Sequence, residues 1–215
     1  MRKHIHPLVQ LVGFASVIAA GLGVAAVACA SEPVTPKDDP PGSAYAEFAG
    51  GCFWCMESDF EKLDGVLSAV SGYTGGPEKS PTYEQVSEHK TGHFESVRVV
   101  YDPKKLTYEK LVSYFFHHVD PTQGTGQFCD LGPQYRTAIF TIDDAQKKTA
   151  EKVKADIEKS GVLHAPIQTI IKPANEFWPA ESYHQDYYKK SPTSYHAYRE
   201  GCGRDDRVQQ LWGSH

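Results

Sequence analysis

Residues 45–63 read YAEFAGGCFWCMESDFEKL, and this stretch decides the fold. Its first half predicts a short strand over residues 45–51, ended by the glycines. In its second half, apolar side chains recur at spacings of three and four residues, as on one face of a helix: Phe53, Met56, Phe60 and Leu63. Two adjacent glycines permit a tight turn between the elements. The stretch therefore predicts a strand followed by a helix, with Cys52 at the junction.

The remaining elements follow from the same periodicities, taken outward from this stretch. Strands are expected over residues 67–73, 94–101, 135–142 and 167–172, and helices over 107–119 and 143–160. Residues 74–93, rich in Gly, Pro and polar residues, predict a long functional loop. The order βαββαβ with an αβ addition predicts an α+β fold, a two-layer ferredoxin-like sandwich. Beyond Pro173 we expect a long, irregular C-terminal tail with one short helix near residues 181–189.

The length and composition exclude several classes of protein. At 215 residues the chain is expected to hold one domain with appendages, since domains average ~150 residues. With 23% charged and 40% hydrophobic residues it is neither collagen-like nor wholly disordered. The net charge of -5, without a run of Lys and Arg in the body of the chain, argues against nucleic acid as a partner. Five cysteines are too few for a disulfide-dense scaffold, so each is a candidate for chemistry.

The N-terminal residues predict export. Two basic residues precede an apolar run that ends at Ala28, so residues 1–28 have the composition of a signal sequence. Ala-Val-Ala directly before Cys29 fits cleavage to a soluble protein, but also a lipoprotein signal with lipid attached to Cys29. An uncleaved membrane anchor is the third alternative. Residues 29–44 are acidic and rich in proline, which predicts a tether. We expect a catalytic domain over 45–212, periplasmic or held at the membrane facing the periplasm or the outside.

Cys52 is the first candidate for chemistry. At the N-terminal end of a helix, backbone N–H groups and the helix dipole favour a thiolate, which predicts a reactive nucleophile rather than a structural thiol. Cys55 completes the C-x-x-C spacing of thiol–disulfide oxidoreductases. Zinc is disfavoured, because Cys129 and Cys202 are single and give no second ligand pair.

Glu95 is the second candidate. In the strand expected over 94–101 it shares one face with Val97, Val99 and Tyr101. A carboxyl on an apolar face loses solvation, which raises its pKa and lets it keep a proton that it can donate. The alternative is that Glu95, at the end of the strand, points its carboxylate into solvent and stays ionised.

Five separated motifs in one order carry a family resemblance over roughly residues 45–212. They are Gly51-Cys52-Phe53-Trp54, Pro81-Thr82-Tyr83, Gly92-His93-Phe94-Glu95, Gln134-Tyr135-Arg136 and Phe177-Trp178-Pro179-Ala180-Glu181-x-Tyr183-His184-Gln185. With them the sequence resembles a peptide methionine-S-sulfoxide reductase of the A type. The resemblance implies a ferredoxin-like α+β core, repair of oxidised methionine in proteins, and no bound metal or organic cofactor.

The resemblance also implies roles for single residues. Cys52 is expected to attack the sulfoxide sulfur and Glu95 to supply the proton for the oxygen. The hydroxyls of Tyr83 and Tyr135 are expected to hold that oxygen, with the acid Asp130 nearby. Phe53 and Trp54 match an aromatic wall for the methyl group, so that only the S epimer fits. The alternative for Tyr83 and Tyr135 is a packing role, and the alternative for Asp130 is a place in a turn. His184 is at least as well explained by a structural role as by a catalytic one.

Recycling of Cys52 requires a second thiol, because oxygen transfer leaves a sulfenic acid. The family pattern has Gly where Cys55 stands and its recycling cysteines in the C-terminal tail. The candidates here are Cys202 first, then Cys55, then Cys129. A thioredoxin-type partner is the expected reductant. The nearby charged residues predict a salt-bridged tail surface: Arg199, Arg204, Asp205, Asp206 and Arg207.

Two other functions remain open at this point. A thioredoxin-like thiol–disulfide oxidoreductase would use Cys52 and Cys55, but would leave Glu95 and the tyrosine motifs without a role. A non-catalytic extracytoplasmic binding module would use a surface rich in the 12 Tyr and 10 Phe residues.

Overall fold

The computed structural model describes residues 39–213. The expected signal sequence 1–28, Cys29 and most of the expected tether 29–44 lie outside these residues. Within 39–213, no helix is both long and apolar enough to cross a membrane.

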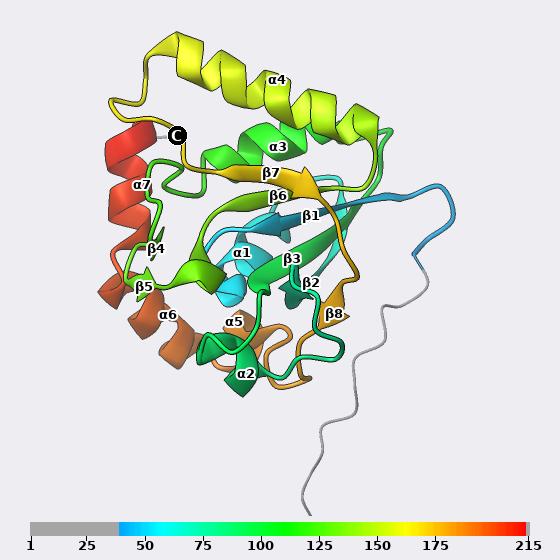
Figure 1. Ribbon diagram of the computed structural model, residues 1–215, viewed down its shortest axis with the longest axis vertical. Helices are drawn as coiled ribbons and strands as arrows, with labels where there is room; N and C mark the ends of the chain where they lie inside the picture. Colours follow the sequence, from blue (N-terminus) through cyan, green and yellow to red (C-terminus); the bar gives the residue numbers. More distant parts are fainter. Residues whose placement is uncertain (1–38, 214–215) are drawn as a thin grey trace, which may run out of the picture. The chain divides into compact units, whose positions relative to one another are not determined.

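A six-stranded sheet in the order β7-β6-β1-β3-β2-β8 forms the centre of the domain (Figure 1). Its strands are β1 Ala44–Ala49, β2 Val66–Thr74, β3 Phe94–Tyr101, β6 Ala138–Thr141, β7 Ile170–Pro173 and β8 Trp178–Pro179. β3 is antiparallel to both β1 and β2, and β6 is antiparallel to β1. This is the arrangement expected of βαββαβ, and β7 is added parallel to β6 after a helical crossover. The predicted α+β class is confirmed.

Three helices pack on one face of the sheet. They are α1 Phe53–Phe60, α3 Tyr108–Phe116 and α4 Asp144–Ser160. The ring of Phe48 on β1 stacks on Phe60 of α1 and on Phe115 of α3, each with centroids 5.0 Å apart. Ala150 and Val153 of α4 belong to the same core cluster. Burial of these side chains fixes α1, and therefore its N-terminal end, against the sheet.

The loop expected over 74–93 contains a short helix, α2 Tyr83–Ser87. Thr82 and Gln85 form a reciprocal capping box at its start, which satisfies two backbone N–H groups. The hairpin strands β4 Gly126–Gln127 and β5 Asp130–Leu131 and the 3-10 helix η1 Pro133–Tyr135 precede β6. Tyr83, Asp130 and Tyr135 from these short elements line a cavity beside Cys52, the residue that precedes α1. The elements themselves are shown in Figure 1.

The C-terminal tail differs from its expected irregular form. It contains α5 Tyr187–Lys190, α6 Pro192–Gly201 and α7 Arg204–Trp212. In each of α6 and α7 one residue is fully buried, Tyr195 and Arg204 respectively, so an apolar periodicity could not reveal them.

The expected salt-bridged tail surface is wrong for Arg204, whose exposed fraction is 2%. Ion pairs do form at the two neighbouring arginines, between Arg199 and Asp205 and between Arg207 and Asp120. Arg204 instead reaches under the turn that follows β1, where its guanidinium donates to a backbone carbonyl.

Candidate active site

The turn between β1 and α1 presents Cys52 as the N-cap residue of α1. Gly51 has φ 82°, and a Cβ on it would lie 2.6 Å from the Cβ of Gln127. Only glycine therefore combines this backbone conformation with such close packing. Cys52 lies at the strand–helix junction that the sequence predicts, and its exposed fraction is 6%.

A small cavity of about 60 Å³ lies beside Cys52. Its lining residues come from six separate elements or turns: Cys52, Phe53, Trp54, Tyr83, Glu95, Asp130, Tyr135 and Tyr198. Seven of these eight are the residues predicted to carry the chemistry or bind substrate. The eighth is Tyr198 on α6, which the sequence does not single out, because no motif or apolar periodicity distinguishes it from the other tyrosines of the tail.

Glu95 faces this cavity from β3 and is 2% exposed, so the solvent alternative is wrong. Its carboxyl accepts a hydrogen bond of 3.1 Å from the backbone N–H of Phe53, in the first turn of α1. Burial raises the pKa of Glu95 to about 8, against the lowering effects of the Phe53 N–H and of a hydrogen bond with Tyr135. The carboxyl therefore holds a proton at neutral pH, at a position where it can donate it.

Asp130 connects the cavity to the C-terminal tail. Its carboxylate accepts hydrogen bonds from the Tyr198 hydroxyl and from the backbone N–H of Cys52. Burial nevertheless raises the pKa of Asp130. It is a strand residue of β5 that contacts the backbone of Cys52.

The tyrosine hydroxyls of the cavity remain donors across the physiological range. Burial raises the pKa of Tyr83 to about 12, and that of Tyr135 further still. Two neutral hydroxyls and a protonated carboxyl can together hold a polar oxygen without placing a negative charge against it.

Trp54 forms the other wall of the cavity and is held by two contacts. Its indole N–H donates to Nδ1 of His184 at 3.0 Å, and its ring stacks on Tyr187 with centroids 3.9 Å apart. Burial lowers the pKa of His184 to about 4, so the imidazole is neutral and can accept this bond. The ring of His184 is thus bonded to the side chain of Trp54 and fixes the orientation of the indole.

The four described cysteines form two pairs. Cys129, on the β4–β5 hairpin, and Cys202, after α6, form a disulfide across 73 residues, while Cys52 and Cys55 are free thiols. Cys129 is exposed, whereas Cys55 is 1% exposed. The candidates for recycling are thus gathered around one site, and their order of reaction stays a prediction.

The electrostatics of Cys52 differ from the sequence prediction. The pKa of the Cys52 thiol is raised, mainly by burial and next by a hydrogen bond with Cys55, although Cys52 lies at a helix N-terminus. The same hydrogen bond lowers the pKa of Cys55. Desolvation of the thiolate therefore outweighs the helix dipole, and Cys55 is the more easily ionised of the two thiols.

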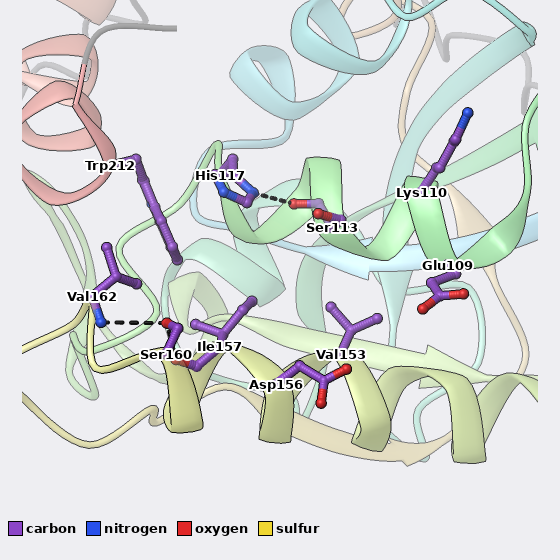
Figure 2. A pocket seen from close by; sticks show the side chains of 10 residues that line it. All are labelled: Glu109, Lys110, Ser113, His117, Val153, Asp156, Ile157, Ser160, Val162 and Trp212. Carbon is purple, nitrogen blue, oxygen red and sulfur yellow. Dashed lines mark hydrogen bonds between the residues drawn. The ribbon is translucent and has the colours of Figure 1, made fainter.

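A wider cavity of about 500 Å³ lies between α3, α4 and the end of α7 (Figure 2). Ser113 of α3 and His117, the C-cap residue of that helix, line it, and Trp212 lies at one end. Its lining contains no cysteine and none of the predicted site residues. Cavity size therefore does not locate the chemistry in this domain, whereas the set of titratable groups does.

The sequence matches known proteins over the described domain. A profile of the peptide methionine sulfoxide reductase family matches residues 44–215. The peptide methionine sulfoxide reductase MsrA of Bacillus licheniformis is 50% identical over 168 residues, which cover 78% of this chain and 93% of the relative. The MsrA/MsrB protein of Vibrio cholerae is 45% identical over 184 residues, or 86% of this chain. The chain spans about half of that relative, 49% of its length.

Solved structures show the same fold. Mxr1 from Saccharomyces cerevisiae in reduced form superposes with a TM-score of 0.68 at 33% identity, covering 73% of this chain and 90% of Mxr1. Mxr1 in complex with Trx2 superposes with a TM-score of 0.50 at 26% identity, covering 71% of this chain and 90% of that one.

The raised pKa of Glu95 predicts a pH-dependent stability. In the unfolded chain a glutamate has a pKa of about 4.3, so its stabilising contribution is complete below that pH and is lost as the pH rises through 8. Relative to the wild type, Glu95→Gln should therefore gain stability between pH 5 and 8, by up to about 1.4 kcal/mol per pH unit. Urea unfolding at four pH values measures this difference.

The matched control for that measurement is the substitution Glu88→Gln. Glu88 is exposed and forms an ion pair with Lys90. Its difference from the wild type should stay constant over the same range. A constant difference for Glu95→Gln as well would show that Glu95 is ionised in the folded protein.

Proposed function

The chain belongs to the peptide methionine sulfoxide reductase family, and we propose that it reduces the S epimer of methionine sulfoxide in peptides and proteins to methionine. It is an oxidoreductase that acts by thiol chemistry. One observation carries the proposal: a free thiol, a protonated carboxyl, two tyrosine hydroxyls and an aromatic wall line one cavity. Free methionine sulfoxide is a second proposed substrate.

The first step transfers the sulfoxide oxygen to Cys52. The Cys52 thiolate attacks the substrate sulfur and forms an S–S bond while Glu95 protonates the oxygen. The protonated oxygen then passes to the Cys52 sulfur: the substrate S–O bond and the new S–S bond break, and an S–O bond forms on Cys52. Methionine gains two electrons, and Cys52 loses two as it becomes a sulfenic acid.

The walls of the cavity explain selection of one epimer. Phe53 and Trp54 offer an apolar surface for the methyl group, and the hydroxyls of Tyr83 and Tyr135 meet the oxygen with Glu95. At a chiral sulfur, exchange of these two groups would place the oxygen against the rings and leave the hydroxyls unpaired. That mismatch costs about 1–3 kcal/mol for each unsatisfied buried group.

Recycling is proposed to start at Cys55. Its thiolate attacks the Cys52 sulfenic acid, an S–S bond forms, and the oxygen leaves with a proton as water. With Cys129 and Cys202 both reduced, the thiolate of one attacks the Cys52–Cys55 disulfide to form a mixed disulfide, and the thiolate of the other displaces it, which leaves a Cys129–Cys202 disulfide and two thiols at Cys52 and Cys55. The pairing found here, with Cys129 bonded to Cys202, corresponds to that end point.

A thioredoxin-type protein is the proposed reductant. The Cys52 and Cys55 sulfurs are buried, whereas Cys129 is exposed on a hairpin where another protein's thiol can attack. The yeast structural relative forms a complex with Trx2, which supports the same class of partner.

The thioredoxin-like alternative finds less support. An oxidoreductase that acts on disulfides of other proteins needs an accessible C-x-x-C pair, and here Cys52 is 6% and Cys55 1% exposed. It would also leave the protonated Glu95 without a role.

The function predicts stereospecific turnover. With dithiothreitol as reductant, the protein should consume the S epimer of a methionine sulfoxide peptide and leave the R epimer, measured by chromatography. Cys52→Ser should abolish turnover, and Glu95→Gln should lower it about 10²–10⁴-fold because the proton donor is lost. Equal consumption of both epimers, or turnover by Cys52→Ser, would contradict the assignment.

The recycling order predicts distinct trapped species after one turnover without reductant. In Cys55→Ser, the Cys52 sulfenic acid should accumulate and react with dimedone. In Cys202→Ser, the Cys52–Cys55 disulfide should accumulate instead. Mass spectrometry of cysteine peptides distinguishes the two. Disulfide formation in Cys55→Ser as fast as in the wild type would favour direct attack by Cys202, the first candidate from the sequence.

Export is our proposal for location, supported by the composition of residues 1–28. The mature protein is expected in the periplasm, or at the membrane if Cys29 carries lipid. Fractionation of cells that express the full chain should find it outside the cytoplasm, and Cys29→Ser should release any membrane-bound fraction. Recovery with a cytoplasmic marker would contradict export.

A further inference from the structure

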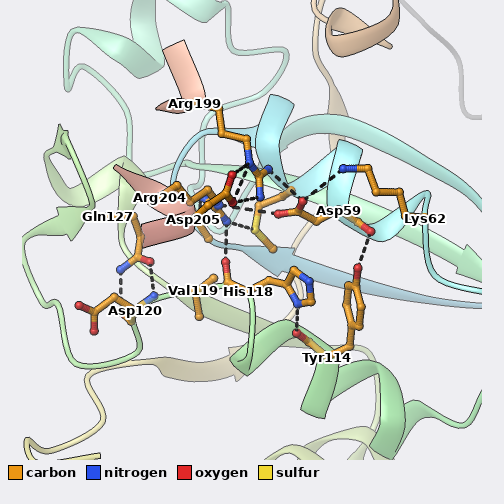
Figure 3. Close-up of polar contacts among 12 residues, drawn as sticks. Asp59, Lys62, Tyr114, His118, Val119, Asp120, Gln127, Arg199, Arg204 and Asp205 are labelled. Carbon is orange, nitrogen blue, oxygen red and sulfur yellow. Dashed lines mark hydrogen bonds and ion pairs between the residues drawn. The ribbon is translucent and has the colours of Figure 1, made fainter. Parts of the chain in front are cut away.

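A network of ion pairs, outside the lining of the substrate cavity, connects Asp59 with arginines of the C-terminal tail (Figure 3). It joins the end of α1 to the C-terminal tail through Asp59, Arg199, Arg204 and Asp205. Asp59 is 3% exposed and pairs with Arg199 at 2.9 Å. None of these side chains lines the substrate cavity, so the reaction described above does not explain the burial of Asp59 and Arg204.

Arg204 is the most enclosed member of the network. Its Nη1 donates to the Gly50 carbonyl at 3.0 Å, and its Nη2 donates to the His118 carbonyl at 2.9 Å. Nη2 also lies 2.8 Å from the sulfur of Met56, and the guanidinium stacks 4.7 Å from the ring centre of Phe128. Nε has no hydrogen-bond partner, and its nearest carboxylate oxygen, on Asp59, is 3.7 Å away.

Burial of an incompletely paired cation is costly, and a hydrophobic side chain would stabilise the tail at lower cost. The contacts of Arg204 point to another role. Gly50 is two residues before Cys52, and Met56 lies one turn into α1. Nη1 also lies 3.6 Å from where a Cβ on Gly51 would stand. The guanidinium therefore lies directly against the turn that presents the nucleophile.

The positive charge of Arg204 acts on the second thiol. The pKa of Cys55 is lowered first by its hydrogen bond with Cys52, and Arg204 and Arg199 lower it further against the effect of burial. Asp59 acts in the opposite sense. The other titratable groups that face the thiol pair are Glu95, Asp130, Tyr83, Tyr195 and Tyr198. Arg204 and Arg199 are thus the cations that act on this thiol pair among the described residues.

We propose that Arg204 is a positioning residue for the thiol pair: it holds the Gly50–Cys52 turn in place and keeps the shared negative charge on Cys55. Cys55 is then present as the thiolate that attacks the Cys52 sulfenic acid in the proposed recycling step. The consequence for catalysis rests on the proposed function, whereas the charge on the thiol pair does not.

The test is the pH dependence of alkylation of Cys52 and Cys55 by iodoacetamide. The full chain is used with the Cys129–Cys202 disulfide intact, and peptide mass spectrometry gives the rate at each site. Arg204→Met removes the charge and keeps an apolar chain of similar length. In Arg204→Met, the midpoint of the curve of Cys55 alkylation rate against pH should rise by at least one pH unit. The alkylation rate of Cys55 at pH 7 should therefore fall about tenfold. Arg204→Lys should restore most of that midpoint.

The matched control is Arg207→Gln on the same helix. Arg207 pairs with Asp120 at 2.7 Å and touches neither thiol, so its profile should equal that of the wild type. A folded Arg204→Met protein with an unchanged profile would show that Arg204 is only a structural anchor. If Arg204→Met does not fold, Arg204→Lys and Arg199→Gln decide. The proposal is supported if the midpoint of Cys55 alkylation is unchanged in Arg204→Lys and raised in Arg199→Gln. Any other pair of results overturns it.

Sulfoxide turnover separates this inference from the proposed function. A shifted thiol profile in a protein that reduces no sulfoxide would leave the role of Arg204 intact and remove the assigned activity. Stereospecific turnover by the wild type, together with an unchanged alkylation profile in Arg204→Met, would support the assigned activity and remove the proposed role of Arg204.

Discussion

The hydrogen bond from the Phe53 backbone to the Glu95 carboxyl is the interaction on which the site depends. The first N–H groups of a helix lack intrahelical partners and need an acceptor. Here the acceptor is a buried side chain on β3, so α1 cannot begin elsewhere without leaving that N–H unpaired. The same bond places a protonated carboxyl next to Cys52. One contact therefore sets both the register of the helix and the position of the acid.

The topology of the sheet makes this contact available. β3 lies between β1 and β2, so the strand that carries Glu95 is adjacent to the strand that leads into Cys52. Short polar elements then complete the cavity from three sides: α2 supplies Tyr83, the β4–β5 hairpin Asp130, and η1 Tyr135. The packed core holds the Cys52 thiol and the Glu95 carboxyl, while short polar elements supply the tyrosine and aspartate side chains that face them.

The C-terminal tail is held by polar contacts as well as by aromatic packing, in which Tyr195 lies against Cys52 and Cys55. Tyr198 bonds to Asp130, Cys202 bonds to Cys129, and Arg204 reaches the Gly50 carbonyl. Each contact ends at a residue next to, or within two residues of, a reacting cysteine or a cavity residue. The tail is therefore part of the redox site, which explains why helices with so little apolar surface adopt one defined position.

The sequence alone determined the α+β order of elements, the strand–helix junction at Cys52 and the apolar face that Glu95 shares. These features depend on local periodicity and on backbone constraints within a few residues. Separated motifs also identified seven of the eight cavity residues through a family resemblance. Only the tertiary structure decided that Tyr198 joins them, that Cys129 pairs with Cys202, and that Arg204 is buried. It also reversed the expected pKa shift of Cys52. Such features depend on which distant segments meet and on how completely they exclude water, and neither is encoded in the spacing of residues along the chain.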